Sequence, residues 1–386
     1  MKIVHLCLGN PYIDNYSYQE NMLTKYHVKM GHEVTVIASM VSFDKNGKYC
    51  LLDEEVTRMD NDGYKVIRID FKGRGTIFYK YNKFFRHFNN FYKLLEQEKP
   101  DIIFCHNITF GDTSVVVEYL KKHKNVKLFA DNHADYINSG RNFISKQFLH
   151  KIIWRHYGKK LEPYLERCYG VTPLRCDYLA DIYKIKKSVI KFLPMGIDDD
   201  AIPQNPDEIR KEIEKTHNIP HDAFIIATGG KIDKLKNIHH LINAVIKENN
   251  PKIHLIVFGN VAIEMQDTME SLFKNERVHR AGWCNNEQVM RILSAADLCF
   301  FPGTHSVLWE QAVGLGKPCV FKEWYKMTHV NINGNCIFVK GENEEELQKV
   351  IRDLIGTDLY KEIHHKANIA AKEFRYSEFA KKAIEL

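Results

Sequence analysis

One short segment, Gly230–Asn237, carries two lysines in a setting that suits phosphate binding. It follows an apolar run at 223–228 that predicts a strand, and it precedes a helical pattern that begins at Ile238. A glycine-led turn exposes backbone N–H groups, and the start of a helix adds partial positive charge, so anions bind well there. Because Lys231 and Lys236 are both cationic, the turn suits a diphosphate better than a single phosphate.

Two histidines follow strand-like runs in the first half of the chain. His133 comes after the run at 127–130, and His106 comes after the run at 101–105. A histidine at the carboxyl end of a strand can hydrogen-bond a reacting group. For His106, a structural histidine with satisfied ring nitrogens is an equally good interpretation. Asp135 could orient His133 or contact a second substrate.

Strand-like runs and helical patterns alternate along the whole chain, which is typical of parallel sheets covered by helices on both faces. The first strand, helix and strand are expected at 2–8, 18–30 and 33–38. Further strands are expected at 65–69, 101–105, 127–130, 170–172, 189–193, 223–228, 253–258, 278–281, 298–301 and 318–321. The helices of the second half are expected at 238–247, 263–274, 286–295 and 306–315.

The length of 386 residues suggests two domains. A proline-containing, charged segment at 197–221 separates the halves. We expect an α/β domain at 1–195, a second at 196–372, and a C-terminal helix at 373–386 that returns to the first domain. Open parallel sheets bind ligands at the carboxyl ends of their strands. Two such domains facing each other therefore predict a two-substrate site in the cleft.

Composition narrows the class of protein. The net charge is +6, from 55 basic and 49 acidic side chains, which favours anionic ligands or an anionic membrane surface without indicating nucleic-acid binding. Nine scattered cysteines without a CxxC pair fit a reducing cytosol. The apolar runs fall short of the ~20 residues that span a bilayer, and the first strand is too short and polar for a signal peptide. We therefore expect a cytoplasmic protein.

Several short motifs occur in a fixed order along the chain. They are Gly31-His32-Glu33-Val34, Pro100-Asp101-Ile102, Asp131-Asn132-His133, Pro194-Met195-Gly196-Ile197-Asp198, Gly230-Lys231 with Lys236-Asn237, Ala296-Asp297-Leu298, Glu310-Gln311-Ala312 and Gly316-Lys317-Pro318. In this order they resemble the GT-B glycosyltransferases, and most closely the retaining, glycogen-synthase-like family four. The resemblance spans nearly the whole chain. It implies a GT-B fold of two Rossmann-like domains, with the acceptor in the first and a nucleotide-sugar donor in the second.

The resemblance also implies roles for the residues that match. Lys231 and Lys236 would neutralise the donor diphosphate, which is the leaving group, and His133 would lie near the reaction centre. Glu310 would accept hydrogen bonds from two ribose hydroxyls. Further donor contacts are expected from Gly9, Asn10, Gly230, Trp283, His305, Ser306 and Val307. The acceptor side is expected to include Tyr18, His106 and Asp135.

The sequence departs from the family before Glu310. The family has a first glutamate eight residues earlier, where this chain has Pro302, so His305 or Thr304 would occupy the space near the donor sugar. The acidic triplet Asp198-Asp199-Asp200 is interpreted as a capping feature, and neither a metal nor a cofactor is expected.

The activity implied is retaining transfer of a hexose, expected to come from a UDP-sugar, to a glycan or polyprenyl-linked acceptor in capsule or lipopolysaccharide synthesis. The alternatives are a nucleotide-sugar epimerase of the same fold and a non-catalytic sugar-nucleotide-binding subunit.

Two segments of the first domain combine apolar and basic residues. One is the aromatic and basic segment 79–93. The other has apolar rows at Ile144, Phe148 and Ile152 and at Leu149, Ile153 and Tyr157, flanked by four lysines and Arg155. Such segments suit docking on anionic lipid headgroups. The alternative is an ordinary amphipathic helix that covers the first sheet.

Overall fold

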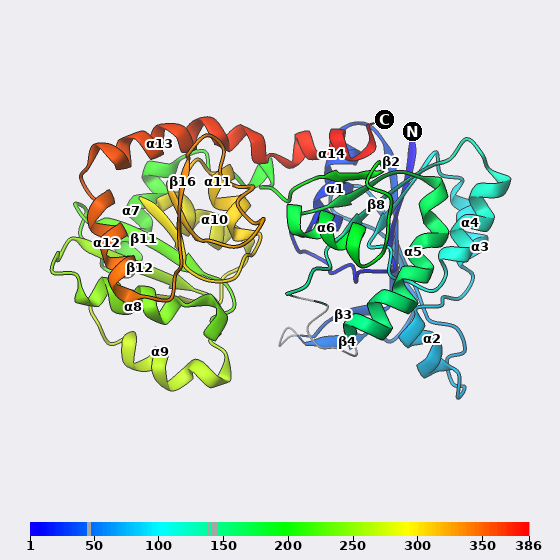
Figure 1. The fold of residues 1–386 in the computed structure, drawn as a ribbon, viewed down its shortest axis with the longest axis horizontal. Coiled ribbons are helices and arrows are strands. Elements are labelled where there is room, and N and C mark those ends of the chain that lie inside the picture. The colour runs from blue at the N-terminus through cyan, green and yellow to red at the C-terminus, as the bar shows by residue number, and fades with distance from the viewer. Residues whose placement is uncertain (45–47, 138, 140–144, 386) are drawn as a thin grey trace. The chain divides into compact units, whose positions relative to one another are not determined.

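The computed structural model describes residues 1–44, 48–137, 139 and 145–385. The chain forms two compact units, shown in Figure 1. The first comprises Met1–Pro194 together with Tyr376–Leu386, and the second comprises Met195–Arg375. Each unit has its own sheet and its own buried apolar core.

The first unit contains an eight-stranded sheet in the order β10-β9-β8-β7-β1-β2-β6-β5. All neighbours pair in parallel except β5, which is antiparallel to β6 at one edge. Because β1 lies between β7 and β2, the strand order reverses beside β1. The strands are β1 (Lys2–Cys7), β2 (Glu33–Ser39), β5 (Thr57–Met59), β6 (Lys65–Ile69), β7 (Ile102–His106), β8 (Lys127–Asn132), β9 (Leu165–Gly170) and β10 (Ile190–Phe192), with β3 (Val41–Phe43) and β4 (Tyr49–Leu51) forming a separate hairpin.

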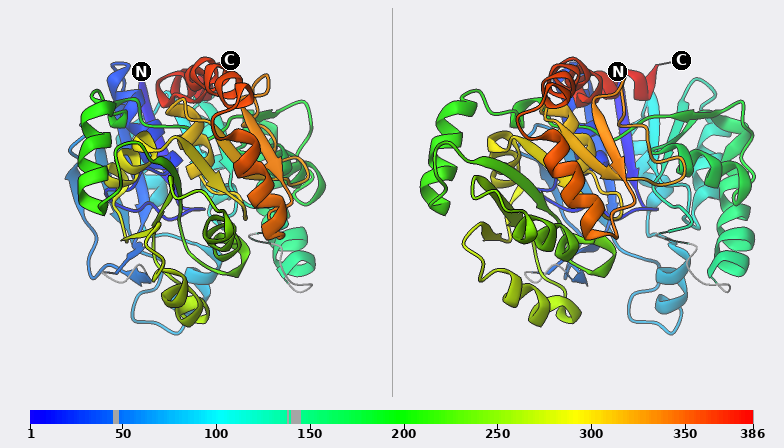
Figure 2. Two further views of the ribbon diagram at one scale, coloured as in Figure 1. Left: turned by 90° about the vertical axis from the view of Figure 1, so that its left-hand side faces the viewer. Right: turned by 60° about the vertical axis from the view of Figure 1, so that its left-hand side comes forward.

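Helices cover both faces of this sheet (Figure 2). They are α1 (Gln19–Lys29), α2 (Tyr79–Phe85), α3 (Phe91–Glu98), α4 (Thr113–Lys122), the π-helix η1 (Ser145–Trp154), α5 (Arg155–Leu161), the 3₁₀ turn η2 (Glu162–Tyr164) and α6 (Pro173–Asp181). The C-terminal helix α14 (Tyr376–Ile384) belongs to this unit and packs against α1. The hydroxyl of Tyr169 donates to the carbonyl of Lys382 at 2.9 Å, which attaches α14 to β9.

The second unit contains a six-stranded, fully parallel sheet in the order β13-β12-β11-β14-β15-β16. Its strands are β11 (Phe224–Gly229), β12 (Ile253–Phe258), β13 (Val278–Gly282), β14 (Leu298–Phe301), β15 (Cys319–Lys322) and β16 (Cys336–Val339). Its helices and 3₁₀ turns are η3 (Asp199–Ala201), α7 (Pro206–His217), η4 (Lys234–Lys236), α8 (Ile238–Lys247), η5 (Ile263–Met265), α9 (Gln266–Leu272), α10 (Asn286–Ala295), α11 (Leu308–Gly314), α12 (Glu344–Leu354), α13 (Asp358–Ala370) and η6 (Ala371–Phe374).

The expected elements differ from the observed ones in several places, and the short strands β3, β4 and β5 were not expected. The prediction of a strand at 170–172 is wrong. The strand there is β9, Leu165–Gly170, in which the partly exposed Glu166 and Arg167 interrupt the apolar run. The helix expected at 263–274 is divided into η5 and α9. Strand β16 was not expected either, because its apolar run is only four residues long.

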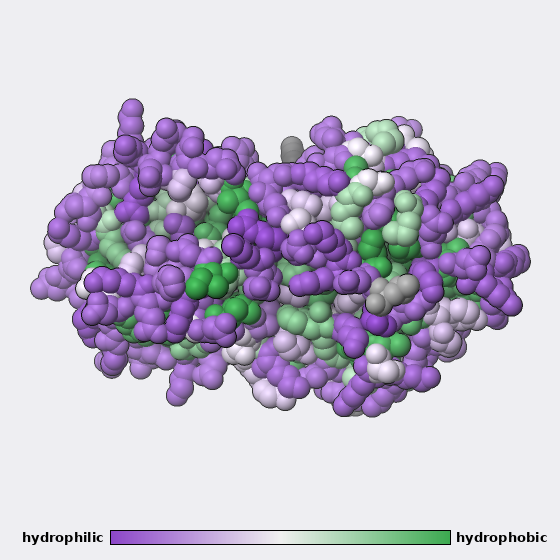
Figure 3. Space-filling view, turned by 90° about the horizontal axis from the view of Figure 1, so that it is seen from above, coloured by the Kyte–Doolittle hydropathy of each residue, from purple (hydrophilic) through white to green (hydrophobic). Residues whose placement is uncertain are grey.

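The face of the molecule shown in Figure 3 is mostly hydrophilic, and its apolar residues form small separate groups. Several large apolar side chains elsewhere are strongly exposed, notably Ile77, Phe78, Tyr81 and Phe84 on and before α2. Among the described helices, none is both long enough and apolar enough to cross a bilayer.

Candidate active site

The two lysines of the sequence motif lie at the carboxyl edge of the second sheet. Strands β11 and β14 pair in parallel there, although β12 follows β11 in the chain, so the strand order reverses between them. At such a reversal the loops leave in opposite directions and open a crevice for a ligand. The loop after β11 carries Gly230, Lys231 and Lys236, and the loop after β14 carries His305, Ser306 and Val307.

Lys236 joins these two loops. Its ammonium group donates to the carbonyl oxygen of Thr304 at 2.5 Å and lies 3.5 Å from that of His305. The backbones are also close, since a Cβ added to Gly303 would lie 2.3 Å from the Cα of Lys236. Burial lowers the pKa of Lys236 to about 8, although the nearby Asp233 carboxylate opposes this shift. Lys231, in contrast, is exposed.

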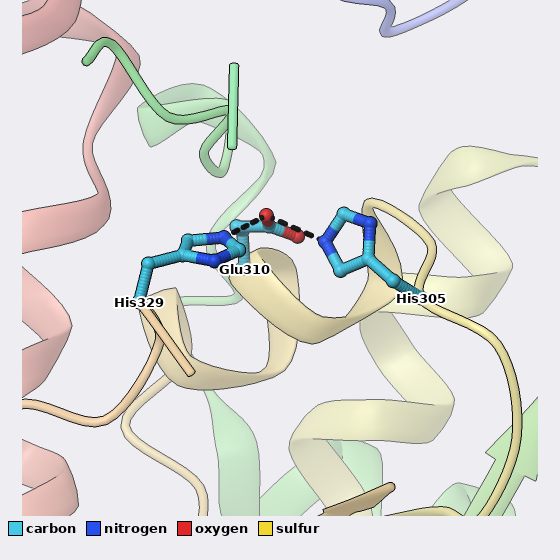
Figure 4. Close-up of side chains that lie close together, drawn as sticks. All are labelled: His305, Glu310 and His329. Carbon is cyan, nitrogen blue, oxygen red and sulfur yellow. Dashed lines mark hydrogen bonds and ion pairs between the residues drawn. The ribbon is translucent and has the colours of Figure 1, made fainter. Parts of the chain in front are cut away.

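Glu310 lies fully buried in α11, with an imidazole on each side of its carboxylate (Figure 4). Nε2 of His305 and Nε2 of His329 each lie 2.8 Å from Oε1 of Glu310. Burial opposes the charged form, but His305 and then His329 outweigh it and hold the pKa of Glu310 well below its usual range. An ionised carboxylate only accepts, so both imidazoles donate an N–H to Oε1. The other oxygen, Oε2, is buried and has no hydrogen-bond partner among the described residues.

The same three side chains are also a possible metal-binding group, because their ligand atoms lie within 4.8 Å of one another. Two imidazoles and a carboxylate are common ligands of zinc and of other divalent transition metals. Figure 4 shows the carboxylate oxygen between the two rings, at hydrogen-bond distance from each. The two N–H donors therefore account for the contacts to Oε1 without a cation.

The first unit presents a second group of polar side chains at the carboxyl edge of its sheet. Gly9 follows β1 and approaches the loop after β7 so closely that a Cβ on it would lie 2.5 Å from the carbonyl oxygen of Asn107. Asn10 donates its amide to Oε1 of Glu20 at 3.0 Å. His133 directly follows β8, and its Nε2 lies 3.5 Å from Oδ1 of Asp131.

The remaining expected residues occupy varied environments. His106 is fully buried, and its ring nitrogens face His5 and Asp131, which fits the alternative of a satisfied histidine. Asp135 is buried and accepts a hydrogen bond from Arg175 at 3.1 Å. This contact holds Arg175 and does not orient His133. Tyr18 and Trp283 are exposed, at 38% and 64%. Burial raises the pKa of Tyr18 to about 12.

The sequence patterns did not indicate His329, and they gave only weak signals for Asp131 and Glu20, which also belong to these groups. His329 lies in the loop between β15 and β16, where nothing in its neighbourhood indicates a site. Asp131 contacts both His106 and His133. The only sign of this role in the sequence is its position two residues before His133. Glu20 is buried in the first turn of α1, and one of its oxygens has no hydrogen-bond partner among the described residues.

Two α/β units, each with a parallel sheet and polar side chains at the carboxyl edge beside the strand reversal, define the GT-B architecture. Residues 21–201 match the family described as Glycosyltransferase Family 4, and residues 209–374 match the Glycosyl transferases group 1. The chain therefore belongs to the GT-B glycosyltransferases of group 1, and it is an enzyme of that class.

Solved structures with the same fold cover nearly the whole chain. The Alr3699/HepE protein of Anabaena, in complex with UDP and glucose, is 13% identical, with a TM-score of 0.68 and coverage of 99% of this chain and 98% of that one. A glycosyltransferase of Rickettsia africae ESF-5 is 16% identical, with a TM-score of 0.68 and coverage of 99% and 96%. WaaG, a glycosyltransferase of lipopolysaccharide biosynthesis, is 15% identical, with a TM-score of 0.65 and coverage of 99% and 98%. A search of curated proteins gives no match.

Proposed function

We propose that the protein transfers a hexose, with retention, from a UDP-sugar to a glycan or polyprenyl-linked acceptor in the synthesis of a cell-surface polysaccharide. The donor binds in the second unit, with its diphosphate at Lys231 and Lys236 and its ribose at Glu310. Anabaena HepE has been solved with UDP-glucose and WaaG acts in lipopolysaccharide biosynthesis, which supports this donor class and this kind of acceptor.

The observation that carries the donor assignment is the second oxygen of Glu310. A buried carboxylate oxygen without a partner is costly unless a ligand supplies donors. Oε1 is already held by His305 and His329, so Oε2 is the atom left for ribose hydroxyls. The low pKa of Glu310 keeps the group in the accepting, ionised form.

The proposed chemistry is a front-face displacement. The bond between the anomeric carbon and the diphosphate oxygen breaks while the acceptor oxygen bonds to the same face of that carbon. The acceptor proton passes to the departing phosphate oxygen. The protein contributes positioning and charge stabilisation through Lys231, Lys236 and His133.

The ribose assignment is tested by comparing UDP with 2′-deoxy-UDP in a calorimetric titration. A hydrogen bond to a charged group contributes about 1.5–3 kcal/mol, so UDP should bind ~10-fold more tightly or better. Glu310→Gln should lose most of this preference, whereas Glu287→Gln, which changes an exposed glutamate of α10, should keep it. Equal binding of both nucleotides by the unchanged protein would refute the assignment.

The transfer itself is tested by nucleotide release from UDP-, GDP- and ADP-sugars with a polyprenyl-linked acceptor. Release from a UDP-sugar that depends on the acceptor supports the proposal. Tight binding without turnover for every donor would support a non-catalytic subunit instead. Conversion of the donor sugar without any acceptor would support an epimerase.

The acceptor class suggests where the first unit meets a membrane. Ile77, Phe78, Tyr81 and Phe84 are 55–88% exposed. The surrounding stretch, 71–95, contains six lysines and arginines and no acidic residue. In η1, Phe148 and Ile152 are exposed, while Leu149 and Ile153 pack on the core; Ile144 of the expected row is outside the described residues. Exposed aromatics beside cations fit an anionic lipid surface.

This attachment is tested by sedimentation with vesicles. The unchanged protein should bind vesicles that contain phosphatidylglycerol and remain free with phosphatidylcholine alone. The double variant Phe78→Ser with Phe84→Ser should lose most of this binding. Ile263→Ser, which removes an even more exposed apolar side chain from the second unit, should not. Binding that survives the double variant would place the membrane contact elsewhere.

A further inference from the structure

Three buried histidines form a row in the interior of the first unit. His5 on β1, His27 on α1 and His106 on β7 are all 0% exposed. Nδ1 of His5 lies 2.9 Å from Nε2 of His106, and Nε2 of His5 lies 3.0 Å from Nδ1 of His27. The row therefore uses ring nitrogens from three separate elements, each at hydrogen-bond distance from the next.

Both ends of the row meet groups that accept hydrogen bonds. At one end, Nε2 of His27 lies 2.9 Å from the carbonyl oxygen of Ala380 in α14. At the other end, Nδ1 of His106 lies 2.7 Å from Oδ2 of Asp131. A carbonyl oxygen accepts hydrogen bonds and cannot donate them, and the same is true of an ionised carboxylate.

Counting protons along the row leads to a definite result. The row has four contacts, and each needs one hydrogen because two bare lone pairs would repel each other at these distances. Three neutral imidazoles supply only three N–H groups. Starting from Ala380, each neutral ring donates toward the carbonyl and accepts from the next ring, so the missing proton falls between His106 and Asp131.

We infer that His106 is a buried imidazolium paired with the ionised Asp131, and that this pair is a positioning device for His133. Asp131 keeps the charge because Oδ1 also accepts from the backbone N–H of Asn107 at 3.0 Å and faces Nε2 of His133 at 3.5 Å. A cation on His106 thus holds the carboxylate that orients the histidine at the candidate reaction centre.

The surroundings agree with this placement of the proton. Burial lowers the pKa of His5 strongly and that of His27 to about 4, so these two rings are neutral. Burial opposes ionisation of Asp131, but His106 and then His133 hold its pKa well below its usual range. The other titratable groups that act on these residues are His32, Glu20 of α1 and the thiols Cys7, Cys105 and Cys168.

The proton is detected directly by NMR of protein labelled with ¹⁵N in its histidine rings, at about pH 8, where a free imidazole is neutral. We expect both ring nitrogens of His106 to carry a proton, and one nitrogen each of His5 and His27 to be bare. His106→Gln identifies its signals by their loss. A bare nitrogen on His106 in the unchanged protein would overturn the inference, and this readout needs no enzymatic activity.

Two variants separate the pair from the rest of the row. Asp131→Asn removes the balancing charge, so His106 should lose its second proton. His27→Gln keeps a donor to Ala380 and an acceptor for His5, so His106 should stay doubly protonated. A doubly protonated His106 in Asp131→Asn would contradict the pairing.

The link to His133 rests on the proposed function and is tested separately. Asp131→Asn should lower kcat ~10-fold or more with little change in the KM for the donor, as expected for a residue that orients a histidine. His27→Gln should keep kcat close to that of the unchanged protein. If NMR shows the imidazolium but kcat is unaffected by Asp131→Asn, the positioning role is refuted while the proposed transfer stands.

Discussion

The ammonium group of Lys236 lies 2.5 Å from the carbonyl oxygen of Thr304 and so ties the loop after β11 to the loop that leads into α11. The residue proposed to bind the donor diphosphate therefore also fixes the start of the helix that carries Glu310. The carbonyl oxygens of Thr304 and His305 contact this ammonium, whereas Lys231 is exposed to solvent. The two lysines consequently have different tasks, and their variants should behave differently.

Replacing Lys236 by methionine should weaken UDP binding by about 10- to 100-fold, because a charge-assisted contact of about 1.5–3 kcal/mol is lost. It should also lower the thermal midpoint, since Thr304 and His305 lose their donor. Calorimetric titration and thermal unfolding measure the two effects. Lys234→Met removes an exposed charge from the same turn and is the matched control. Equal effects of the two variants would show that only overall charge matters.

Donor affinity should fall as the pH rises above about 8. Burial lowers the pKa of Lys236 to about 8, so the free protein loses the ammonium charge from that pH upward. A bound diphosphate favours the charged form, so binding near pH 8 should take up a proton. Titrations in two buffers of different ionisation enthalpy measure this uptake. An uptake that persists in Lys236→Met would assign it to another group.

The strands of both sheets could be predicted largely because buried parallel strands are continuous apolar runs. All six residues of β12 are buried, and its predicted bounds agree with the structure. The same argument explains the failures. In β9 the partly exposed Glu166 and Arg167 interrupt the apolar run, and β16 is an apolar run of only four residues, too short to stand out from its surroundings.

The candidate site divides in the same way. Lys231, Lys236 and Glu310 belong to local motifs, so spacing along the chain could indicate them. His329 contacts Glu310 although the two are 19 residues apart in the sequence, and His5 contacts His106 at a separation of 101 residues. Such contacts are created by strand order and loop packing, and a single sequence has no local pattern that reports them.

Glu310→Gln should destabilise the protein at neutral pH and much less in acid. Two imidazole donors stabilise the charged carboxylate, and weakening them should cost about 1–3 kcal/mol. Because the folded-state pKa lies below the ordinary value of 4.5, this stabilisation is complete above that pH and is lost as the pH falls through the folded value. Urea unfolding at pH 7, 5, 4 and 3 measures the difference between the two proteins.

Glu287→Gln provides the baseline for this comparison, since Glu287 is exposed on α10. Its stability should follow that of the unchanged protein at every pH. If the difference caused by Glu310→Gln stayed constant down to pH 3, the charge of Glu310 would not be the source of the stabilisation.

Removal of divalent metals should leave donor binding unchanged, because Oε1 of Glu310 already receives N–H groups from His305 and His329. UDP titrations before and after dialysis against EDTA test this directly. His329→Gln gives a sharper comparison, since a glutamine amide can donate to Glu310 but is a poor ligand for zinc. If the imidazole acts as a donor, this variant should keep most of its affinity for UDP. If the three residues hold a metal, EDTA should abolish binding, one equivalent of Zn²⁺ or Mn²⁺ should restore it, and His329→Gln should behave like the EDTA-treated protein.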